Sequence, residues 1–239
     1  MTTNRLAWII LLLLTVAVQL PAQRSEVDRK LLADVLAKAD KGDAQSQNAL
    51  GMVFSTGGLG VAKDQVEAVN WFRKAAEQSY VEAQFALGDC YANGRGVAKN
   101  EVEAVKWYRK AADQNYVKAQ YNLGVCYANG RGVAKDEVEA VKWYRKAADQ
   151  NYVNAQYNLA QCYANGQGVA KDYVEAYKWC LLAKAQGDER ANKSMTTVGR
   201  GMTQEQVAEG QKLARDFKPR VVPPTASDGS RPGIAPTRP

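Results

Sequence analysis

The sequence predicts an all-α protein, an α/α solenoid in which about four helical hairpins stack into a right-handed superhelix between capping helices. Each repeating unit has two segments with apolar residues at helical spacing. Six of the seven prolines lie at or after Pro219 and the other is Pro21, so no proline interrupts the helices between them. Four tryptophans mark the repeat, at intervals of 36 residues: Trp71, Trp107, Trp143 and Trp179.

The chain begins with a pattern typical of a signal peptide. Arg5 precedes the apolar stretch Leu6–Val18, and Pro21 and Ala22 end it with a small residue suited to cleavage. Its 13 residues are short for a membrane span, which needs about 20. Because Leu20 is a less suitable residue two positions before that cut, an uncleaved N-terminal anchor stays an alternative. We therefore expect an exported protein, periplasmic or secreted, that contacts a membrane only through an uncleaved N-terminal segment.

Residues 23–43 precede the first repeat and are expected to cap the array. Val27–Lys41 has the pattern of one helix, and Lys38–Asp43 resembles the end of a second repeat helix. Terminal units of a solenoid need faces that differ from those of internal units.

The repeating unit is clearest in two consecutive copies. Residues 81–116 match residues 117–152 at all but five positions, and the copies on either side are looser. The apolar residues of both segments fall on one face of a helix, which predicts a helical hairpin. They are Ala83, Leu87, Cys90 and Tyr91 in the first segment, and Ala104, Trp107, Tyr108, Ala111 and Ala112 in the second.

Glycines separate the two helices of each unit. Gly94 and Gly96 can take the left-handed conformation that ends a helix. Asn100 and Glu103 have the spacing of a capping box that opens the second helix. A phosphate-binding loop is the other interpretation, but these glycines follow a helix and no G-K-[ST] motif occurs. The same box is expected at Asp64/Glu67, Asp136/Glu139 and Asp172/Glu175.

Two further helices are expected after the last repeat. The first is short and starts near Glu189, and the second covers Thr203–Phe217, where Thr203 and Gln206 form another capping box. From Pro219 onward the chain cannot bury enough apolar surface to offset the entropy of ordering, so we expect a disordered tail. The expected segments are 1–22 (signal peptide or anchor), 23–43 (cap), 44–80, 81–116, 117–152 and 153–187 (repeats), 188–218 (capping helices) and 219–239 (tail).

The repeated residues resemble a known family. The pattern A-x-x-x-L-G-x-x-Y-x-x-G-x-G-V followed by D-x-x-x-A-x-x-W-Y-x-K-A-A is similar to the Sel1-like repeat, a relative of the tetratricopeptide repeat. The resemblance implies an adaptor in signalling or assembly. The last unit departs from the pattern, since Ala160 replaces the glycine and Cys180-Leu181-Leu182 replaces Tyr-Arg-Lys.

Composition argues against several functional classes. The net charge of +7 is spread along the chain and interleaved with acidic residues, which argues against a nucleic-acid partner. The sequence has no histidine, the commonest general base and transition-metal ligand. We therefore expect no metal, no cofactor and no catalytic residues.

The cysteines are expected to be structural. Cys90, Cys126 and Cys162 occupy the same position of successive repeats. Stacked helices lie about 8 to 10 Å apart, whereas a disulfide needs Cα atoms within about 7 Å. A disulfide between Cys162 and Cys180, which lie on the two helices of one hairpin, stays an open alternative.

An enzyme is the rival interpretation. Some cysteine-rich Sel1-like proteins resemble penicillin-binding or β-lactamase proteins, but this chain lacks their paired cysteines and has no S-x-x-K motif. An enzyme acting on an envelope polymer would need convergent carboxylates, such as Glu82 and Asp89. The neighbouring repeats lack both acids at these positions.

Positions that vary between copies identify a candidate binding surface. On the first helix of units two to four they are spaced i, i+4 and i+7, and an asparagine at i+11 completes a stripe on the face opposite Leu87. First helices line the concave side of such solenoids, so this stripe would line a groove. Drift of solvated positions after duplication is the other interpretation. The stripe consists of Glu82, Ala86, Asp89, Asn93, Lys118, Asn122, Val125, Asn129, Asn154, Asn158, Gln161 and Asn165.

These observations predict a non-catalytic scaffold or adaptor of the cell envelope or secreted space. Its partner is expected to be a protein or peptide, with an envelope glycan as the alternative ligand, bound in the concave groove. A membrane-tethered assembly factor and an enzyme acting on an envelope polymer are the alternatives.

Overall fold

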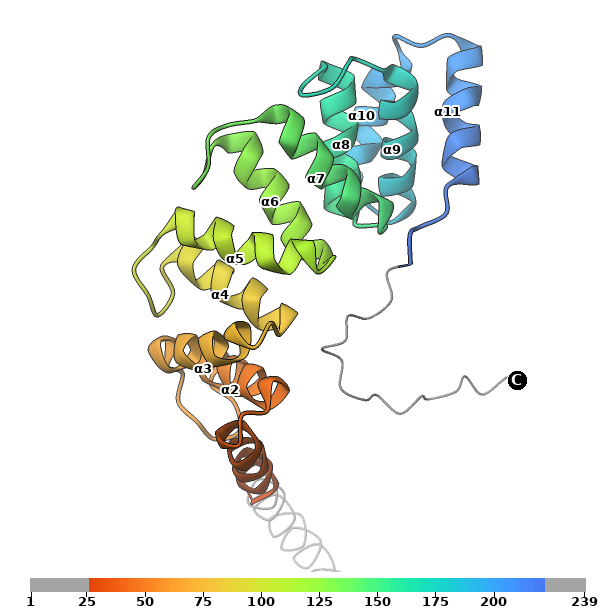
Figure 1. Cartoon of the computed structure of the whole chain (residues 1–239). Coiled ribbons are helices and arrows are strands. Elements are labelled where there is room, and N and C mark those ends of the chain that lie inside the picture. Colours follow the sequence, from red (N-terminus) through yellow and green to blue (C-terminus); the bar gives the residue numbers. More distant parts are fainter. Residues whose placement is uncertain (1–25, 222–239) are drawn as a thin grey trace, which may run out of the picture.

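A computed structural model describes residues 26–221, which form helices and turns without any strand in that range. The helices stack along an arc from residues 26–40 to α10 and α11 (Figure 1). This confirms the predicted α/α solenoid. After the helix over residues 26–40 come α2 (Ala44–Thr56), α3 (Gln65–Glu77), α4 (Val81–Asn93), α5 (Glu101–Asp113), α6 (Val117–Asn129), α7 (Glu137–Asp149), α8 (Val153–Asn165), α9 (Tyr173–Ala185), α10 (Glu189–Gly199) and α11 (Gln204–Asp216).

Consecutive helices pair into four hairpins, each with a first helix (α2, α4, α6 or α8) and a second helix (α3, α5, α7 or α9). The second helices begin at a side-chain cap. Oδ1 of Asn100 accepts a hydrogen bond from the backbone N–H of Glu103 at 3.1 Å. The predicted reciprocal bond is absent there, because the Glu103 carboxylate pairs with Lys106 at 2.6 Å instead. At the start of the second helices the cap side chain accepts its backbone bond, but the predicted return bond from the cap N–H to the glutamate side chain is absent, so the predicted capping boxes are wrong there. On α11 the box of Thr203 and Gln206 has both bonds.

The glycines after α4, α6 and α8 have two different roles. Gly94 ends α4 in the left-handed conformation, with φ of 67°. Gly96 also has a positive φ, and a Cβ atom there would lie 1.9 Å from the carbonyl oxygen of Gln65 in the preceding repeat. Gly132 makes the equivalent approach to Glu101. The second glycine therefore lets consecutive repeats touch through their backbones, which supports the turn interpretation over a phosphate loop.

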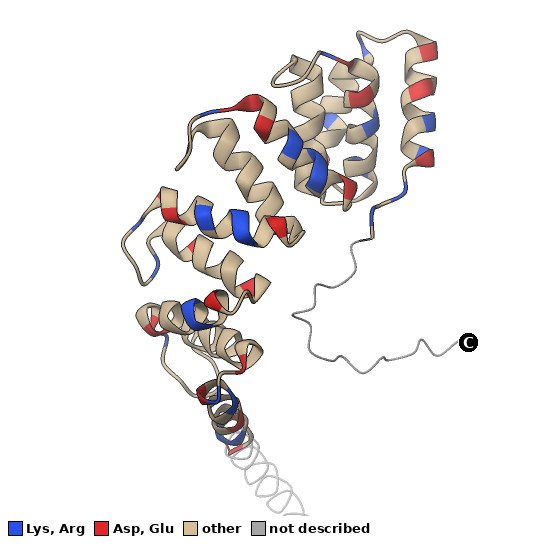
Figure 2. Cartoon of the chain, viewed as in Figure 1, with Lys and Arg blue, Asp and Glu red and all other residues tan. Residues whose placement is uncertain are grey.

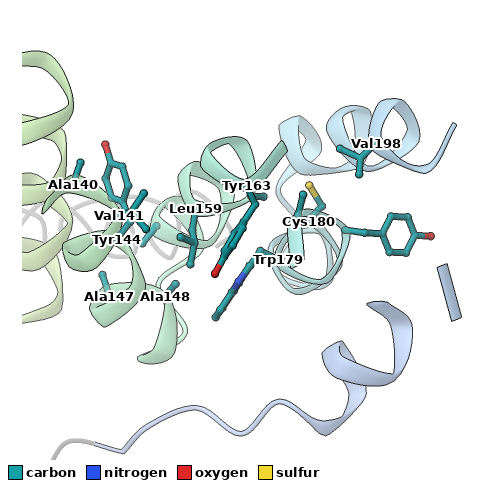
Figure 3. Packing of buried hydrophobic residues seen from close by; sticks show 14 residues of the cluster. Ala140, Val141, Tyr144, Ala147, Ala148, Leu159, Tyr163, Trp179, Cys180 and Val198 are labelled. Atoms are coloured by element: carbon teal, nitrogen blue, oxygen red, sulfur yellow. The ribbon is translucent and has the colours of Figure 1, made fainter. Parts of the chain in front are cut away.

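The core follows the repeat, with one leucine of each first helix fully buried. Beside that leucine, Gly88 packs on the Tyr108 ring and Gly124 on the Tyr144 ring, and a Cβ atom at either glycine would lie under 3.0 Å from the ring. In the last hairpin Ala160 and Cys180 occupy these two positions, and both are 0% exposed within one cluster. Figure 3 shows Cys180 in this cluster, with Leu159 of α8 and Trp179. The last repeat therefore exchanges both residues together: alanine is larger than the glycine it replaces, and cysteine is smaller than the tyrosine it replaces, so the volume of the pair is partly compensated.

Both ends of the array are covered. Residues 26–40 act as a second helix without a hairpin partner in the described range, since Nε2 of Gln47 donates to the carbonyl oxygen of Ala39 at 3.0 Å. At the other end α11 packs against α9. The Phe217 ring then lies edge-on to Trp179, with ring centroids 5.5 Å apart.

The segment after α11 turns back toward the preceding repeat. The backbone N–H of Arg220 donates to the carbonyl oxygen of Asp149 at 2.7 Å. The rest of the predicted tail and the predicted signal peptide lie outside the described residues. Within residues 26–221, no helix is both long and apolar enough to cross a membrane.

Candidate functional site

The stripe residues lie on α4, α6 and α8, and side chains on this face connect consecutive first helices. Nδ2 of Asn122 donates to Oδ1 of Asp89 at 3.4 Å. Gln161 makes the equivalent bond to Ser194 of α10, from Nε2 to Oγ at 2.9 Å. The structure thus brings variable residues of neighbouring repeats together on one continuous surface.

Two adjoining hollows open on this surface. The first has a volume of about 440 Å³, and the stripe residues that line it are Asp89, Asn93, Asn122 and Val125. The second has a volume of about 510 Å³, and the stripe residues that line it are Glu82, Ala86, Asp89 and Lys118. Asp89 lines both hollows, so they form one path across α2, α4 and α6, which we call the first-helix groove. The remaining stripe residues lie outside these two hollows: Asn129, Asn154, Asn158, Gln161 and Asn165.

Asp89 is the electrostatic centre of this groove. Its Oδ1 accepts a hydrogen bond from the Tyr108 hydroxyl at 2.7 Å, and its Oδ2 lies 3.9 Å from the Arg95 guanidinium. Burial raises the pKa of the Asp89 carboxyl, while the Tyr108 hydrogen bond and the positive charges of Arg95 and Lys118 lower it less. Burial and the bond to Asp89 in turn raise the pKa of the Tyr108 hydroxyl. The groove therefore holds an oriented carboxylate that a ligand's donor groups can reach.

Several stripe amides already have partners within the protein. Nδ2 of Asn93 and of Asn129 donates to the carbonyl oxygen four residues earlier, at 2.8 Å in both cases. Oδ1 of Asn154 accepts from Arg190 at 2.7 Å. Asn122 and Asn158 hydrogen-bond to the hydroxyls of Tyr108 and Tyr144. The exposed side chains of Glu82 and Lys118 are freer than these amides to meet a ligand.

The comparison of units two to four missed part of the groove. Asn48, Met52 and Ser55 of α2 line the larger hollow, and Met52 is 52% exposed. At the other end, Arg190 and Ser194 of α10 extend the stripe by one more helix. Aligning α2 and α10 with the three central first helices would have found both extensions.

The cysteine side chains are free thiols in the structure, so no bridge joins Cys162 to Cys180. Cys180 is fully buried and faces α8 at the position of Tyr108 and Tyr144 in the second and third repeats, whereas Cys162 continues the column of Cys90 and Cys126. Burial raises the pKa of Cys126 and Cys162 to about 11 and that of Cys180 to about 12. The described part of the chain has no cluster of three or more histidine, cysteine, aspartate or glutamate side chains placed to hold a metal.

Comparison with known proteins identifies the repeat. A family model described as the Sel1 repeat matches residues 44–80, 81–116, 117–152 and 153–188, in register with the four hairpins. The chain belongs to the Sel1 repeat family. Sel1 repeat proteins generally mediate protein–protein interactions and are generally non-catalytic. A comparison of the sequence with curated proteins gives no significant match.

Two solved structures are similar to this Sel1 repeat protein in both sequence and fold. A protective antigen of uropathogenic Escherichia coli with an SLR fold is 33% identical, with a TM-score of 0.71 over 78% of this chain and 40% of its own. A Sel1 repeat protein from Oxalobacter formigenes is also 33% identical, with a TM-score of 0.68 over 79% of both chains. The chain therefore spans less than half of the Escherichia coli antigen.

Proposed function

We propose that this Sel1 repeat protein is a non-catalytic adaptor that holds a partner polypeptide in the first-helix groove. The observation that carries the proposal is a contrast between the two sets of positions within the first helices. The constant residues Leu87 and Leu123 are fully buried, whereas six of the residues that vary line the two hollows, together with the constant Asn93.

The chemistry of the groove favours a peptide with mixed polar groups. Acidic Asp89 and Glu82 lie beside basic Lys118 and Arg95, and Met52 and Phe85 add apolar surface. A peptide backbone offers both donors and acceptors to such a lining, and its side chains can meet the apolar surface. A glycan would use the same polar groups but gain less from Met52.

Catalysis by an envelope-polymer enzyme has weaker support. Glu82 and Asp89 share the larger hollow, but Asp89 accepts hydrogen bonds from Tyr108 and Asn122 that orient it within the fold. The equivalent residues of the next repeat are Lys118 and Val125, so the array does not repeat the pair. An adaptor accounts for the whole groove, whereas an enzyme would use one repeat of it.

The test is a pull-down from an extract of cell-envelope proteins, with captured proteins identified by mass spectrometry. The groove variant combines Asn122→Arg with Val125→Arg. Its matched control combines Ala98→Arg with Ala134→Arg, which adds the same charge at exposed loop positions. A partner captured by the parent chain and the control, and lost by the groove variant with unchanged helicity, supports the groove. Equal capture by all three contradicts it.

The location of the adaptor is part of the same proposal. Export to the periplasm or secretion follows from the N-terminal pattern of Arg5 and Leu6–Val18. The mass of the protein recovered from cells distinguishes the two forms. Loss of residues 1–22 indicates a released adaptor, and an intact Met1 indicates a membrane-tethered assembly factor.

A further inference from the structure

A second candidate surface lies on the second helices, apart from the first-helix groove. Val66, Val102 and Val138 occupy one position in three consecutive second helices and are 61%, 53% and 54% exposed. A hollow of about 460 Å³ lies beside Val102, and Val105 and Val133 complete its apolar wall. Exposed valines at the same position of three repeats are a recurrent feature of this surface, and at Val102 the valine adjoins an apolar hollow.

Three cations and one carboxylate, that of Asp113, line this hollow, and two of the cations are held by aromatic groups. Lys106 pairs with Glu103 at 2.6 Å. Arg109 instead donates to the Tyr127 hydroxyl, and Nζ of Lys110 lies 4.1 Å from the centroid of the Trp107 ring. Because a hydroxyl and a ring carry no net charge, the charges of Arg109 and Lys110 stay available to a ligand.

The same arrangement recurs one repeat further on. Arg145 donates to the Tyr163 hydroxyl, and Nζ of Lys146 lies 3.9 Å from the centroid of the Trp143 ring. Figure 2 shows the basic residues as blue bands on both α5 and α7. The two helices therefore present matching cations beside matching exposed valines.

In the last repeat the equivalent surface already carries a helix. Val174 and Tyr177 of α9 occupy the positions of Val102 and Val105. Gly210 of α11 packs on them, since a Cβ atom there would lie 3.1 Å from the Tyr177 ring and 3.3 Å from the Val174 carbonyl oxygen. In this covered copy, leucines stand where Arg109 and Lys110 stand in α5.

We propose that the faces of α5 and α7 that carry Val102 and Val138 bind an amphipathic helix of a partner protein, and that this helix carries acidic residues. The helix would set its small and apolar side chains on Val102 and Val138, as α11 does on α9, and direct its carboxylates to the cations that line the hollow. The covered repeat shows that a helix fits this surface, and the change from leucine to arginine and lysine specifies the charge of the helix that fits the uncovered repeats.

A fluorescent peptide with the sequence of residues 203–217 tests this with the full-length chain. Lys212→Glu and Arg215→Glu make the probe acidic while Val207, Gly210 and Leu213 keep its apolar face. A control peptide with Glu205→Lys and Glu209→Lys has the same apolar face and the opposite charge. Fluorescence anisotropy should show saturable binding of the acidic peptide that weakens with salt, and a Kd for the basic peptide more than about tenfold higher.

Two protein variants separate this surface from the first-helix groove. Val102→Asp with Val138→Asp should raise the Kd of the acidic peptide more than about tenfold, and Asn122→Arg with Val125→Arg should leave it unchanged. The proposal is overturned by equal binding of both peptides, or by no saturable binding of the acidic one. If the parent chain does not bind the peptide but self-associates, and the valine variant does not self-associate, the surface would be assigned to a second copy of the chain. Loss of binding to phosphatidylglycerol vesicles in that variant, again without peptide binding, would assign it to a membrane.

Discussion

Nε2 of Gln150 donates a hydrogen bond to Oε1 of Gln120 at 2.7 Å. Gln120 is 1% exposed and in turn donates from Nε2 to the carbonyl oxygen of Ala112 at 3.3 Å. One buried side chain on α6 thereby connects the ends of α5 and α7. The pair recurs at every hairpin, as Gln78/Gln47, Gln114/Gln84 and Gln186/Gln156.

Replacing this glutamine tests what the bond contributes. Gln120→Leu keeps a side chain of similar size but removes two hydrogen bonds, the one to the Ala112 carbonyl oxygen and the one from Gln150. The Ala112 carbonyl keeps its backbone donors, so we expect about 0.5 to 1.5 kcal/mol for each lost bond, or about 1 to 3 kcal/mol in the free energy of unfolding. Urea denaturation followed by circular dichroism measures it. Gln211→Leu, at an exposed position of α11, is the matched control and should change little. A Gln120→Leu protein as stable as the parent would show that packing alone holds the junction.

The second glycines of the loops after α4, α6 and α8, which are Gly96, Gly132 and Gly168, should be less replaceable than glycines whose positive φ is their only constraint. Gly132→Ala puts a Cβ atom 2.1 Å from the Glu101 carbonyl oxygen, whereas nothing lies within 4 Å of one at Gly42. Gly42→Ala should cost about 1 to 2 kcal/mol from its backbone conformation alone, and Gly132→Ala clearly more. Gly58→Ala, without positive φ or a close neighbour, is the control. Equal costs at Gly132 and Gly42 would contradict a contact between repeats.

The fold was predictable because the repeat displays each structural requirement several times. The spacing of Trp71, Trp107 and Trp143 fixed the unit, and Gly94 marked the end of a helix. The Gln120–Gln150 bond was not predictable in the same way, because an unvarying glutamine looks the same in sequence whether it is buried or solvated. Nor could the sequence indicate that α11 packs against α9, since amphipathic spacing identifies an apolar face and not its neighbour.

The candidate site was predictable only in part, for a related reason. Variation between copies selected Asp89, Asn122 and Val125, which do line the groove. It could not indicate that Asn122 bonds to Asp89 across two repeats, because that contact depends on how the hairpins stack. Met52 was missed because it lies in a unit that was not compared.

The exchange of Ala160 and Cys180 for the usual glycine and tyrosine should be reproducible in the preceding repeat. Gly124→Ala alone puts a Cβ atom 2.6 Å from the Tyr144 ring, which must then move. Tyr144→Cys alone leaves a cavity. Both single variants should be destabilised, and the double variant should be more stable than the sum of their losses predicts, by about 0.5 to 3 kcal/mol. Thermal unfolding of all four proteins gives this coupling, and strict additivity would show that the two positions are independent.

Neutralising Asp89 should stabilise the array at neutral pH. Burial raises the pKa of Asp89 in the folded protein above its unfolded value. The folded state therefore binds this proton more tightly, and the resulting stability is present at acidic pH and lost as the pH rises through the folded pKa. Asp89→Asn should be more stable than the parent at pH 7, with the difference shrinking as the pH falls. Asp113→Asn, at an exposed position, is the control for the loss of one negative charge.

The thiols should react slowly while the protein is folded. Burial raises the pKa of Cys126 and Cys162 to about 11 and that of Cys180 to about 12, so at pH 8 little thiolate is present to attack a reagent. We expect alkylation by iodoacetamide to be slow in the native protein and fast in urea. Because the unfolded thiols lose their protons at lower pH, stability should fall as the pH rises above about 9 toward 12. Four titratable thiols in unreduced, denatured protein would confirm free cysteines, whereas two would mean one disulfide, which peptide mapping would test for the pair Cys162 and Cys180.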